Sequence, residues 1–488
     1  MWPRVHPGER SWPYLRPVST QTSRTPERPR PARALRDLAG RLASRRRWVR
    51  QHPHGLWWTF AALHAALFLA LTPLMLSGGV SGDLPLYRTW ATDALSSGSW
   101  PVLDFTWVYP AGALLPIVLP NVLGESMYQF VWLVMLTLLN GVSLWVLTDR
   151  GRRTVETPAA WWWLLVLFLL SPVAFLRLEG FSAPMVLMAL VLLARRPRVA
   201  GLLLAGATWI KVWPAAVIAA VMVASRRRST VVRSALLVTA GVAAAVALGG
   251  GLSRIDTFIS TQSSRGLQLE APLSTPWVWM AMLRVPGASV YQNVALATRE
   301  VMGPGDTWAI NSSTELMLGV VLALLALLAV AAFGLPGARR STSGDEVQLV
   351  LLGALTLTTT FVVFNKVGSP QYMLWIAPVV AVGLAQRPDL FRVPARLTAW
   401  AAGLTTLVFP VMYRELIDLQ PAAVLALAAR NAIVVALFGW CVVRLMEAAL
   451  AAAGLPGWTL RRALGLLAPD RGVAAGVATE ARVLDHER

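Results

Sequence analysis

The segment LMLGVVLALLALLAVAAF, at residues 316–333, carries no polar or charged side chain. Apolar runs of about 20 residues are typical of membrane-spanning helices. In lipid the backbone must satisfy its own hydrogen bonds, and an α-helix does so within the segment. The stretch therefore predicts a helix that crosses a membrane, and its repetition along the chain predicts a helical bundle.

Comparable apolar segments recur along the 488 residues, and we interpret twelve segments in all as spans. Two of them are short, at residues 199–210 and 213–224. The others are residues 57–76, 128–147, 159–176, 182–194, 235–252, 316–333, 347–364, 372–385, 397–412 and 422–443. The expected fold class is all-α: a polytopic membrane helical bundle of about twelve spans, with outer-face loops and surface helices.

The composition fits a membrane protein and argues against several function classes. Hydrophobic residues make up 56% of the chain and charged residues 14%, whereas soluble proteins carry about 25% charged residues. The single cysteine, Cys441, excludes an internal disulfide and a cysteine-based metal site. No histidine pair has convincing ligand spacing, so we expect neither a metal nor a cofactor. The net charge of +19 lies largely in tails and short loops, which favours membrane topology and anionic lipid over nucleic acid.

An Arg-rich connection follows every second predicted span, so all of these connections fall on the same side of the membrane. They are residues 149–153, 195–198, 225–228, 337–340 and 386–392. Because short cytoplasmic loops are enriched in basic residues, we expect these connections and both termini to lie inside. Counting YPAGALLPIVLPNVLG, residues 109–124, as a span would invert every later connection. We interpret this short, proline-punctuated segment as a helix lying against the outer surface.

The chain has only two lysines, Lys211 in WIKVWP and Lys366 in FNKVGSPQY. Each stands where an apolar segment ends. The compact lysine ammonium is well suited to a phosphate oxygen. The alternative is that each lysine is an interface anchor, with its side chain extended to the membrane surface.

Other ionisable residues gather on the predicted outer face, which includes a long loop at residues 253–313. Such groups at a membrane edge are functional candidates. Asp83 and Asp104 follow the first span, and a carboxylate there can take a proton from a hydroxyl group. Lys211, Arg265 and Lys366 could stabilise a phosphate leaving group. Together these residue types suit glycosyl transfer from a lipid-linked sugar phosphate.

These candidates also have structural alternatives. Asp83 could cap the helix that LPLYRTW begins. Arg177 and Glu179 could pair with each other, and Arg265 and Glu270 could be surface charges. For the whole chain, a flippase for lipid-linked substrates would need polar groups on both faces and through the bilayer. A non-catalytic envelope scaffold would not need paired carboxylates and two isolated lysines on one face, so an enzyme is favoured.

Several motifs in combination resemble glycosyltransferase family 87, which belongs to the GT-C class of polytopic glycosyltransferases. They are DLPLY at residues 83–87, the YP of VYPAG at 109–110, IKVWP at 210–214, RGLQLE at 265–270 and NKVGSPQYMLW at 365–375. The resemblance runs from about Trp57 to Trp375. It departs at YPAG, where many relatives have two successive prolines, and this leaves the course of the surface helix open.

The resemblance implies a GT-C-like fold, a polyprenyl-phosphate-sugar donor, an inverting mechanism and an active site on the outer face. Members of the family include mannosyltransferases and arabinofuranosyltransferases of actinobacterial envelope glycolipids and glycans. We therefore expect a multi-pass protein of a bacterial plasma membrane. Its expected partners are the donor lipid, a glycolipid or polysaccharide acceptor and membrane lipids, without nucleic acid. Mannose is the favoured sugar; the alternatives are arabinofuranosyl transfer and a transporter or flippase.

Asp83 is the predicted catalytic base, and Lys366, Lys211 and Arg265 are the predicted ligands of the donor phosphate. No metal ligand is predicted. The remaining residues expected to bind substrate are Asp104, Tyr87, Arg177, Glu179, Gln268, Glu270, Asn365, Gln371 and Tyr372.

We expect three regions along the chain. Residues 1–54 are rich in Arg, Pro and Ser and lack the apolar region of a signal peptide, so they predict a disordered, basic cytoplasmic tail. Residues 55–446 form the predicted GT-C-like transmembrane catalytic domain. Residues 447–488 predict a cytoplasmic C-terminal tail, in which PGWTLRRALGLLAPD could lie along the membrane as an amphipathic helix.

Overall fold

The computed structural model describes residue 52 and residues 54–153, 157–263, 265–294, 298–334 and 343–454. Its contacts divide the chain into two units, Met1–His52 and Pro53–Arg488, and the second unit contains the helical bundle. Most of the predicted basic tail, the Arg-rich connection at residues 337–340 and the predicted interfacial helix lie outside the described residues.

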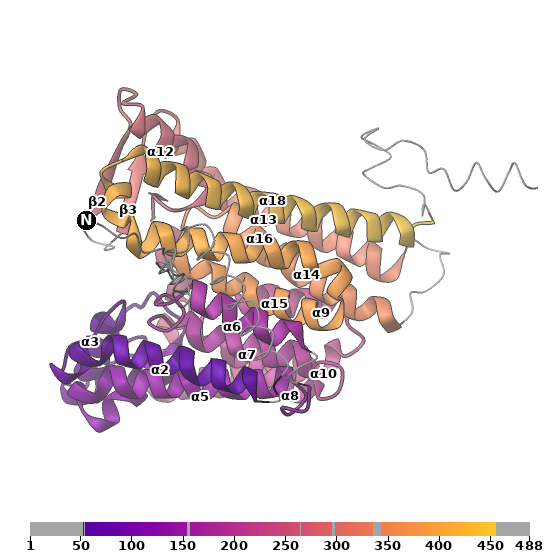
Figure 1. Ribbon diagram of the computed structural model, residues 1–488, viewed down its shortest axis with the longest axis horizontal. Helices are drawn as coiled ribbons and strands as arrows, with labels where there is room; N and C mark the ends of the chain where they lie inside the picture. Colours follow the sequence, from indigo (N-terminus) through magenta and orange to yellow (C-terminus); the bar gives the residue numbers. More distant parts are fainter. Residues whose placement is uncertain are drawn as a thin grey trace, which may run out of the picture. The chain divides into compact units, whose positions relative to one another are not determined.

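Each predicted span coincides with one helix (Figure 1). The helices are α2 (Gly55–Leu76), α5 (Tyr128–Leu147), α6 (Pro158–Leu169), α7 (Glu179–Leu192), α8 (Pro197–Ile210), α9 (Pro214–Ala224), α10 (Arg228–Leu248), α13 (Asp306–Phe333), α14 (Ser343–Val363), α15 (Met373–Gln386), α16 (Pro388–Thr406) and α18 (Pro421–Ala452). Among the described residues, six helices are long and apolar enough to cross a membrane: α2, α5, α10, α13, α14 and α18. The helical membrane bundle is confirmed, and the count of twelve spans stays a prediction.

Prolines end two helices earlier than the hydropathy pattern predicts. α6 stops at Leu169, before Pro172, although the apolar segment continues to residue 176. α16 stops at Thr406, before Pro410. Proline has no N–H for the helix ladder and its ring clashes with the preceding turn. α18 instead continues to Ala452, past the predicted domain boundary at residue 446.

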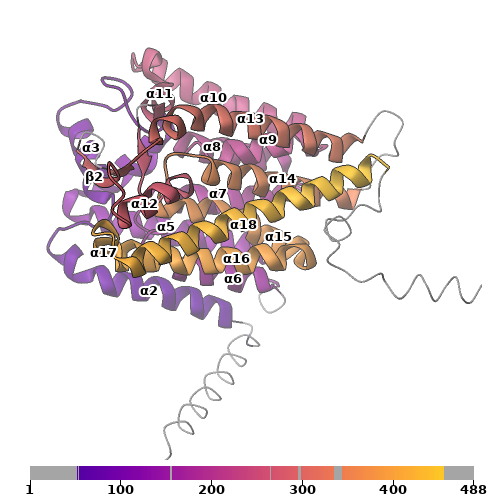
Figure 2. The ribbon, with the colours of Figure 1, turned by 90° about the horizontal axis from the view of Figure 1, so that it is seen from above.

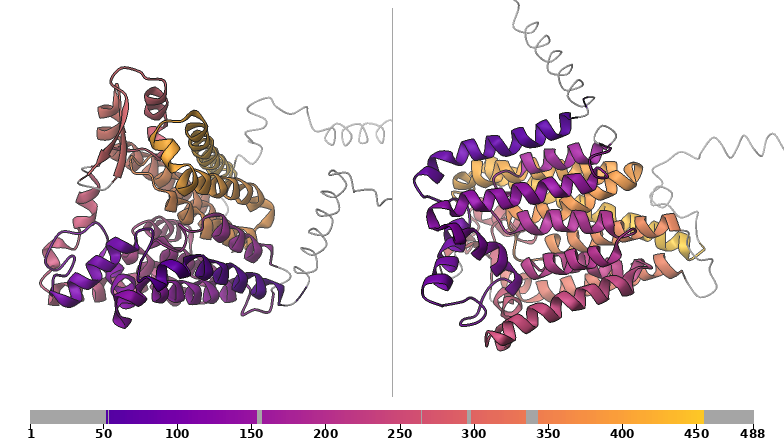
Figure 3. Two further views of the ribbon diagram at one scale, coloured as in Figure 1. Left: turned by 60° about the vertical axis from the view of Figure 1, so that its left-hand side comes forward. Right: turned by 90° about the horizontal axis from the view of Figure 1, so that it is seen from below.

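The predicted long loop at residues 253–313 folds into short helices and a small sheet that hydropathy did not predict. Its elements are η4 (Leu252–Arg254), α11 (Thr257–Ser263), β1 (Leu267–Gln268), η5 (Pro272–Ser274), α12 (Thr275–Met282), β2 (Ser289–Asn293) and β3 (Thr298–Met302). The strands are antiparallel in the order β1-β3-β2, with Leu267 opposite Val301 and Tyr291 opposite Glu300. The rose-coloured hairpin of β2 and β3 stands at the edge of the bundle in Figure 3.

Burial separates central helices from peripheral ones. In the most apolar window of α14, 72% of residues are buried, against 11% in α2 and in α10. Peripheral apolar helices of this kind are expected to face lipid. α18 lies along α13, α14 and α16 (Figure 2). Its first turns also pack on the sheet through a small apolar core that includes Trp277, Val301 and Leu427.

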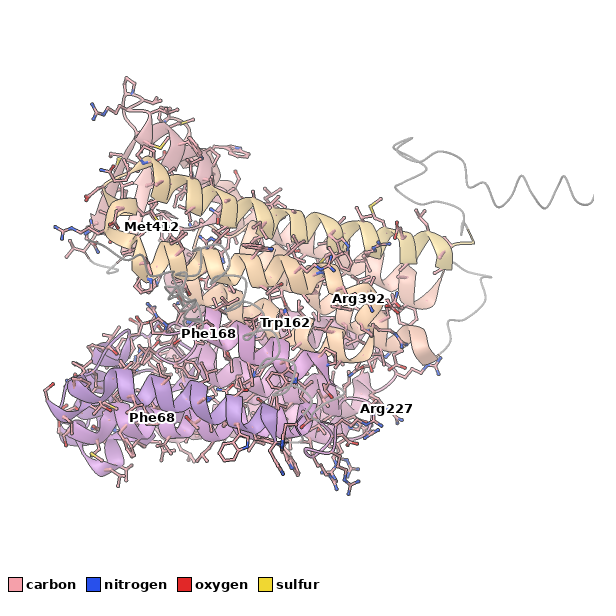
Figure 4. All side chains as sticks on the ribbon, in the orientation of Figure 1. Phe68, Trp162, Phe168, Arg227, Arg392 and Met412 are labelled. Carbon is pink, nitrogen blue, oxygen red and sulfur yellow. The ribbon has the colours of Figure 1, made fainter. Side chains whose placement is uncertain are left out.

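Short elements gather at one end of the bundle, which we call the loop end (Figure 1). Besides α12 and the sheet, this end carries α3 (Leu84–Ser96), η1 (Ala111–Ala113), α4 (Leu114–Val118), η2 (Leu119–Leu123), η3 (Glu125–Met127), η6 (Pro370–Tyr372), η7 (Leu407–Val411) and α17 (Tyr413–Ile417). The predicted surface helix thus consists of η1, α4 and η2. Figure 4 shows Arg227 and Arg392, from two Arg-rich connections, at the opposite end from Met412.

Candidate functional site

Asp83 occupies the position directly before α3, where aspartate commonly caps a helix. Its side chain makes no capping hydrogen bond. One carboxylate oxygen contacts the Arg177 guanidinium, and the Tyr87 hydroxyl donates to the same oxygen at 3.4 Å. The capping alternative is therefore wrong for this side chain, which is held by the segment between α6 and α7.

Two ion pairs meet at the loop end. Arg177 pairs with Asp83, and Lys211 Nζ lies 3.2 Å from Glu179 Oε1. The alternative, in which Arg177 and Glu179 pair with each other, is therefore wrong. Glu179 begins α7 and Lys211 follows α8, so the two pairs join α3, α7 and α8. Only 17% of the Lys211 side chain and 1% of the Glu179 side chain are exposed, so Lys211 points into the protein and is not a surface anchor.

Aromatic side chains surround these ion pairs, and the sequence analysis missed three of them: Tyr109, Trp213 and Trp375. Lys211 Nζ lies 4.3 Å from the centre of the Tyr109 ring, which allows a cation–π interaction. Trp375 stacks on Tyr372 with ring centroids 3.8 Å apart, and Trp213 lies nearly parallel to Trp375 at 6.2 Å. Each of the three stands within a motif of the sequence, VYPAG, IKVWP or QYMLW, and could have been predicted from that position.

Burial and neighbouring charges shift the pKa values of Asp83 and Lys211. Burial raises the pKa of Asp83, and the Arg177 charge opposes that rise. Burial alone would lower the pKa of Lys211, but the Glu179 carboxylate, Tyr109 and Tyr372 together outweigh it and the net shift is upward. Lys211 therefore stays positively charged at neutral pH, while the Asp83 carboxylate is a stronger base than an exposed aspartate.

A second polar group contains Glu270, Arg430 and Tyr413. Arg430 Nη2 donates to the Glu270 carbonyl oxygen at 2.6 Å and lies 4.0 Å from Glu270 Oε2. Burial raises the pKa of Glu270, and Arg430 and Arg177 oppose it. Because Arg177 acts on both Asp83 and Glu270, it connects the two groups. Arg430 was not predicted as a site residue, although it is a charged residue inside the apolar segment at residues 422–443.

Lys366 lies with the sheet, whereas Lys211 lies with Asp83. Lys366 Nζ is 3.5 Å from the Ile310 carbonyl oxygen, and its carbonyl accepts a 2.9 Å bond from the Gln268 backbone. Burial lowers the pKa of Lys366, and the charge of Glu300 in β3 opposes this. The loop after Lys366 is also held to the RGLQLE segment, because the Gly368 N–H donates to Gln268 Oε1 at 3.0 Å.

Three other predicted residues have different surroundings. Asp104 is exposed and accepts a 2.7 Å bond from the Trp100 backbone, so it stabilises its own turn. Asn365 accepts a 2.9 Å bond from the Val367 backbone. Arg265 is half-buried and lies close enough to Tyr372 for electrostatic interaction. The structure thus brings Asp83, Tyr87, Arg177, Glu179, Lys211, Tyr372 and Arg265 toward one centre, with Glu270 linked through Arg177.

Several buried polar atoms around this centre have no hydrogen-bond partner among the described residues. They are Glu179 Oε2, Glu270 Oε2, Gln371 Oε1, Arg265 Nε and Trp375 Nε1, while Glu179 Oε1 is paired with Lys211. Buried polar atoms are nearly always satisfied, so a polar ligand could bond to these atoms. Unused oxygens can accept bonds from hydroxyl groups, and the unused guanidinium N–H suits a phosphate. Within the described ranges, no three His, Cys, Asp or Glu side chains are grouped to hold a metal ion.

The described residues also form an apolar groove of about 470 Å³. Its lining residues come from α10 and from residues 100–122; they are Trp100, Leu103, Ala111, Gly112, Leu114, Leu115, Val118, Leu119, Val122, Val242, Ala245 and Val246. Gly112 packs so closely on Trp209 that an added Cβ would lie 2.8 Å from the Trp209 Cβ. The segments that carry Tyr109 and Lys211 therefore also meet at the groove.

One comparison with known proteins gives a match. The model of glycosyltransferase family 87 matches residues 107–364, which is more than half of the chain. No curated protein and no solved structure matches the chain significantly. The matched region includes Arg177, Glu179, Lys211 and Glu270, whereas Asp83 precedes it.

Proposed function

The chain belongs to glycosyltransferase family 87, and from this premise we propose that it transfers mannose from a polyprenyl-phosphate donor to an envelope glycolipid or glycan. The transfer takes place on the outer face of a bacterial plasma membrane, where the loop end lies. The observation that carries this proposal is the half-buried Asp83 carboxylate, held by Arg177 beside the Lys211–Glu179 pair.

The proposed step is a single displacement with inversion. The acceptor hydroxyl oxygen attacks the anomeric carbon and forms the new C–O bond. The bond between that carbon and the phosphate oxygen breaks, and its electron pair stays on the phosphate. Asp83 takes the hydroxyl proton, for which its raised pKa makes it suitable. Tyr87 and Arg177 hold the carboxylate in place.

Lys211 and Arg265 are the proposed ligands of the leaving phosphate. Lys211 is a buried cation at the same centre as Asp83, and Arg265 offers an unused N–H there. A fixed positive charge stabilises the charge that develops on the leaving phosphate. Lys366, with Asn365, is proposed to support the donor from the sheet side, and Gln268, Gln371 and Tyr372 are proposed substrate contacts.

The apolar groove supports a lipid-linked donor. A phosphate at Lys211 would place the attached carbon chain where residues 109–112 and 209–211 meet, beside the groove. Burial of each CH₂ group is worth about 0.8 kcal/mol, so a long prenyl chain gains affinity from such a surface. We propose that the groove holds the first isoprene units of the donor.

The direct test is product identification. Protein in nanodiscs is incubated with radiolabelled polyprenyl-phosphate-mannose or polyprenyl-phosphate-arabinose and an extract of envelope glycolipids as acceptor. We expect a labelled mannolipid whose formation at a limiting donor concentration falls strongly when Lys211 is changed to Ala. Label transfer from the arabinose donor alone would establish the arabinofuranosyl alternative. Movement of intact donor across the bilayer of sealed vesicles, without any transfer, would instead show a flippase.

A further inference from the structure

Arg430 is a buried charge within the apolar part of α18. It lies nine residues after Pro421, about 13 Å along the helix. Only 3% of its side chain is exposed. A charge at such a position is costly unless it is paired, and in membrane proteins it usually serves a function. An apolar side chain at this position would avoid the cost of burying a charge, so the presence of an arginine suggests a function.

The contacts of Arg430 and its neighbour lead to one segment. Arg430 donates to the Glu270 carbonyl oxygen, and Asn431 Nδ2 donates to Thr275 Oγ1 at 2.8 Å. Ser274 Oγ, in the same segment, donates to the Gln268 carbonyl oxygen at 2.7 Å. Two consecutive residues of α18 therefore fix the turn that presents Glu270 at the loop end.

One carboxylate oxygen of Glu270 can accept a further hydrogen bond. Its Oε2 atom is buried and has no hydrogen-bond partner among the described residues, and Arg430 lies 4.0 Å from that atom. Arg177, the partner of Asp83, also acts on Glu270. The carboxylate therefore lies near enough to Arg177 for electrostatic interaction, and its Oε2 atom accepts no hydrogen bond among the described residues.

We propose that Glu270 binds a hydroxyl group of the acceptor's sugar and that Arg430 is the positioning residue that holds Glu270 there. This inference rests on the proposed function. In a displacement with inversion, the acceptor and the leaving phosphate lie on opposite sides of the anomeric carbon. Lys211 and the groove serve the phosphate and its chain, which leaves the Glu270 group for the acceptor. The ligand class is a polyol headgroup, such as a sugar or a cyclitol.

A set of paired substitutions separates this role from a purely structural clamp. Arg430→Met removes one charge and leaves Glu270 buried without compensation, so it should lower thermal stability. Glu270→Gln keeps the size of the side chain and removes its charge. The double variant Arg430→Met/Glu270→Gln removes both charges, so no unpaired charge stays buried under either role, and glycoside binding is the measurement that separates the two roles. Arg444→Met is the control, because Arg444 lies on the same helix and is largely exposed.

The measurements are thermal unfolding, the KM of each substrate, and binding of octyl mannoside and octyl arabinofuranoside to protein in nanodiscs by calorimetry. Glycoside binding needs no turnover, so it remains informative if the transfer assay fails. We expect Glu270→Gln and the double variant to bind the preferred glycoside about ten- to a hundredfold more weakly, with an unchanged KM for the donor. The double variant should unfold near the wild-type temperature, and Arg444→Met should match wild type throughout.

Two results would overturn the inference. One is wild-type glycoside affinity in the double variant, which would make the pair a clamp only. The other is an equal rise of the donor KM and acceptor KM in Glu270→Gln, which would place Glu270 on the donor. The wild-type protein could transfer no sugar while Glu270→Gln still shows the expected weakening of glycoside binding. That result would refute the proposed function and support the glycoside site at Glu270.

Discussion

At the residue scale, the chemistry depends on which charges become neighbours. Asp83 and Arg177 are 94 positions apart and still form one ion pair, while Lys211 pairs with Glu179. These pairs hold opposite charges beside the aromatic side chains of Tyr87, Tyr109 and Tyr372, and Glu179 Oε2 makes no hydrogen bond among the described residues. The centre is therefore charged and only partly exposed to solvent. Such an arrangement gives electrostatic interactions more strength than they have in water.

Asp83 must be deprotonated to act as a base, so kcat/KM falls as the pH drops through its pKa. Burial raises that pKa and the Arg177 charge opposes the rise. Arg177→Met removes the opposing charge, so the pKa rises further and the acidic limb of the pH profile moves to higher pH. The measurement is kcat/KM across the pH range, with Arg392→Met, an exposed charge at the other end of the bundle, as control. An acidic limb that stays in place, or moves to lower pH, would contradict this role.

The two lysines are predicted to differ. Lys366 has polar neighbours in the chain, namely Asn365, Ser369 and Gln371. In the structure, however, it is Lys211 that lies with Asp83, so we expect Lys211→Ala to raise the donor KM about ten- to a hundredfold and Lys366→Ala to raise it less. Lys211→Arg should rescue only in part, because a planar guanidinium does not replace a compact ammonium. Donor titrations of the three variants test this, and a larger rise of the donor KM in Lys366→Ala than in Lys211→Ala would contradict it.

Residue types could be predicted from the sequence, but their pairing could not. Asp83, Glu179 and Lys211 were recognised because charges at the ends of apolar segments are conspicuous. Their partners depend on which helix ends meet, and hydropathy carries no information about that. Trp213 and Trp375 were missed because tryptophan near a membrane surface is usually an interface residue. Arg430 was missed because it lies inside a segment that is otherwise strongly apolar.

At the element scale, helix termini build the site. α3 begins after Asp83, α7 begins with Glu179, and α8 ends before Lys211. The helices were predictable because each depends on a local apolar run and on proline positions. The sheet was not predictable, because β1 has two residues and pairs with β3 more than thirty positions away. The RGLQLE segment is thus placed by long-range contacts with Lys366 and Arg430.

Filling the apolar groove should impair use of long-chain donors. Ala245 lines the groove on α10, so Ala245→Phe should raise the KM for a full-length polyprenyl donor several-fold. A geranyl-phosphate donor, whose short chain gains little from the groove, should be affected much less. Ala244→Phe is the matched control, because Ala244 is exposed and neighbours Ala245 without lining the groove. Equal loss with both donors, or with both variants, would show that the groove does not hold the prenyl chain.

At the scale of the whole molecule, the two ends of the bundle differ in chemistry. The loop end carries the paired charges, the sheet and the groove, whereas Arg227 and Arg392 lie at the opposite end (Figure 4). Short basic connections of this kind favour the cytoplasmic side. The loop end would then face outward, on the side of the proposed envelope acceptor.

Cysteine labelling can test this orientation in a Cys441→Ala background, in which the buried native thiol is absent. Asp93→Cys on α3 and Arg392→Cys on α16 place thiols at exposed positions of opposite ends. We expect an impermeant maleimide to label position 93 in intact cells, and position 392 only after the membrane is opened. The reverse pattern would invert the topology and move the site to the cytoplasmic side.

The central claim is that Asp83 is the catalytic base, and turnover by Asp83→Asn tests it most directly. Asparagine keeps the size of the side chain but cannot accept the proton, so we expect kcat to fall about a hundred- to ten-thousandfold. Donor binding should persist in the same variant, and Asp93→Asn, an exposed position on α3, should retain wild-type turnover. Near wild-type turnover by Asp83→Asn, together with loss of turnover in Asp104→Asn, would contradict the account and assign the base to the other carboxylate.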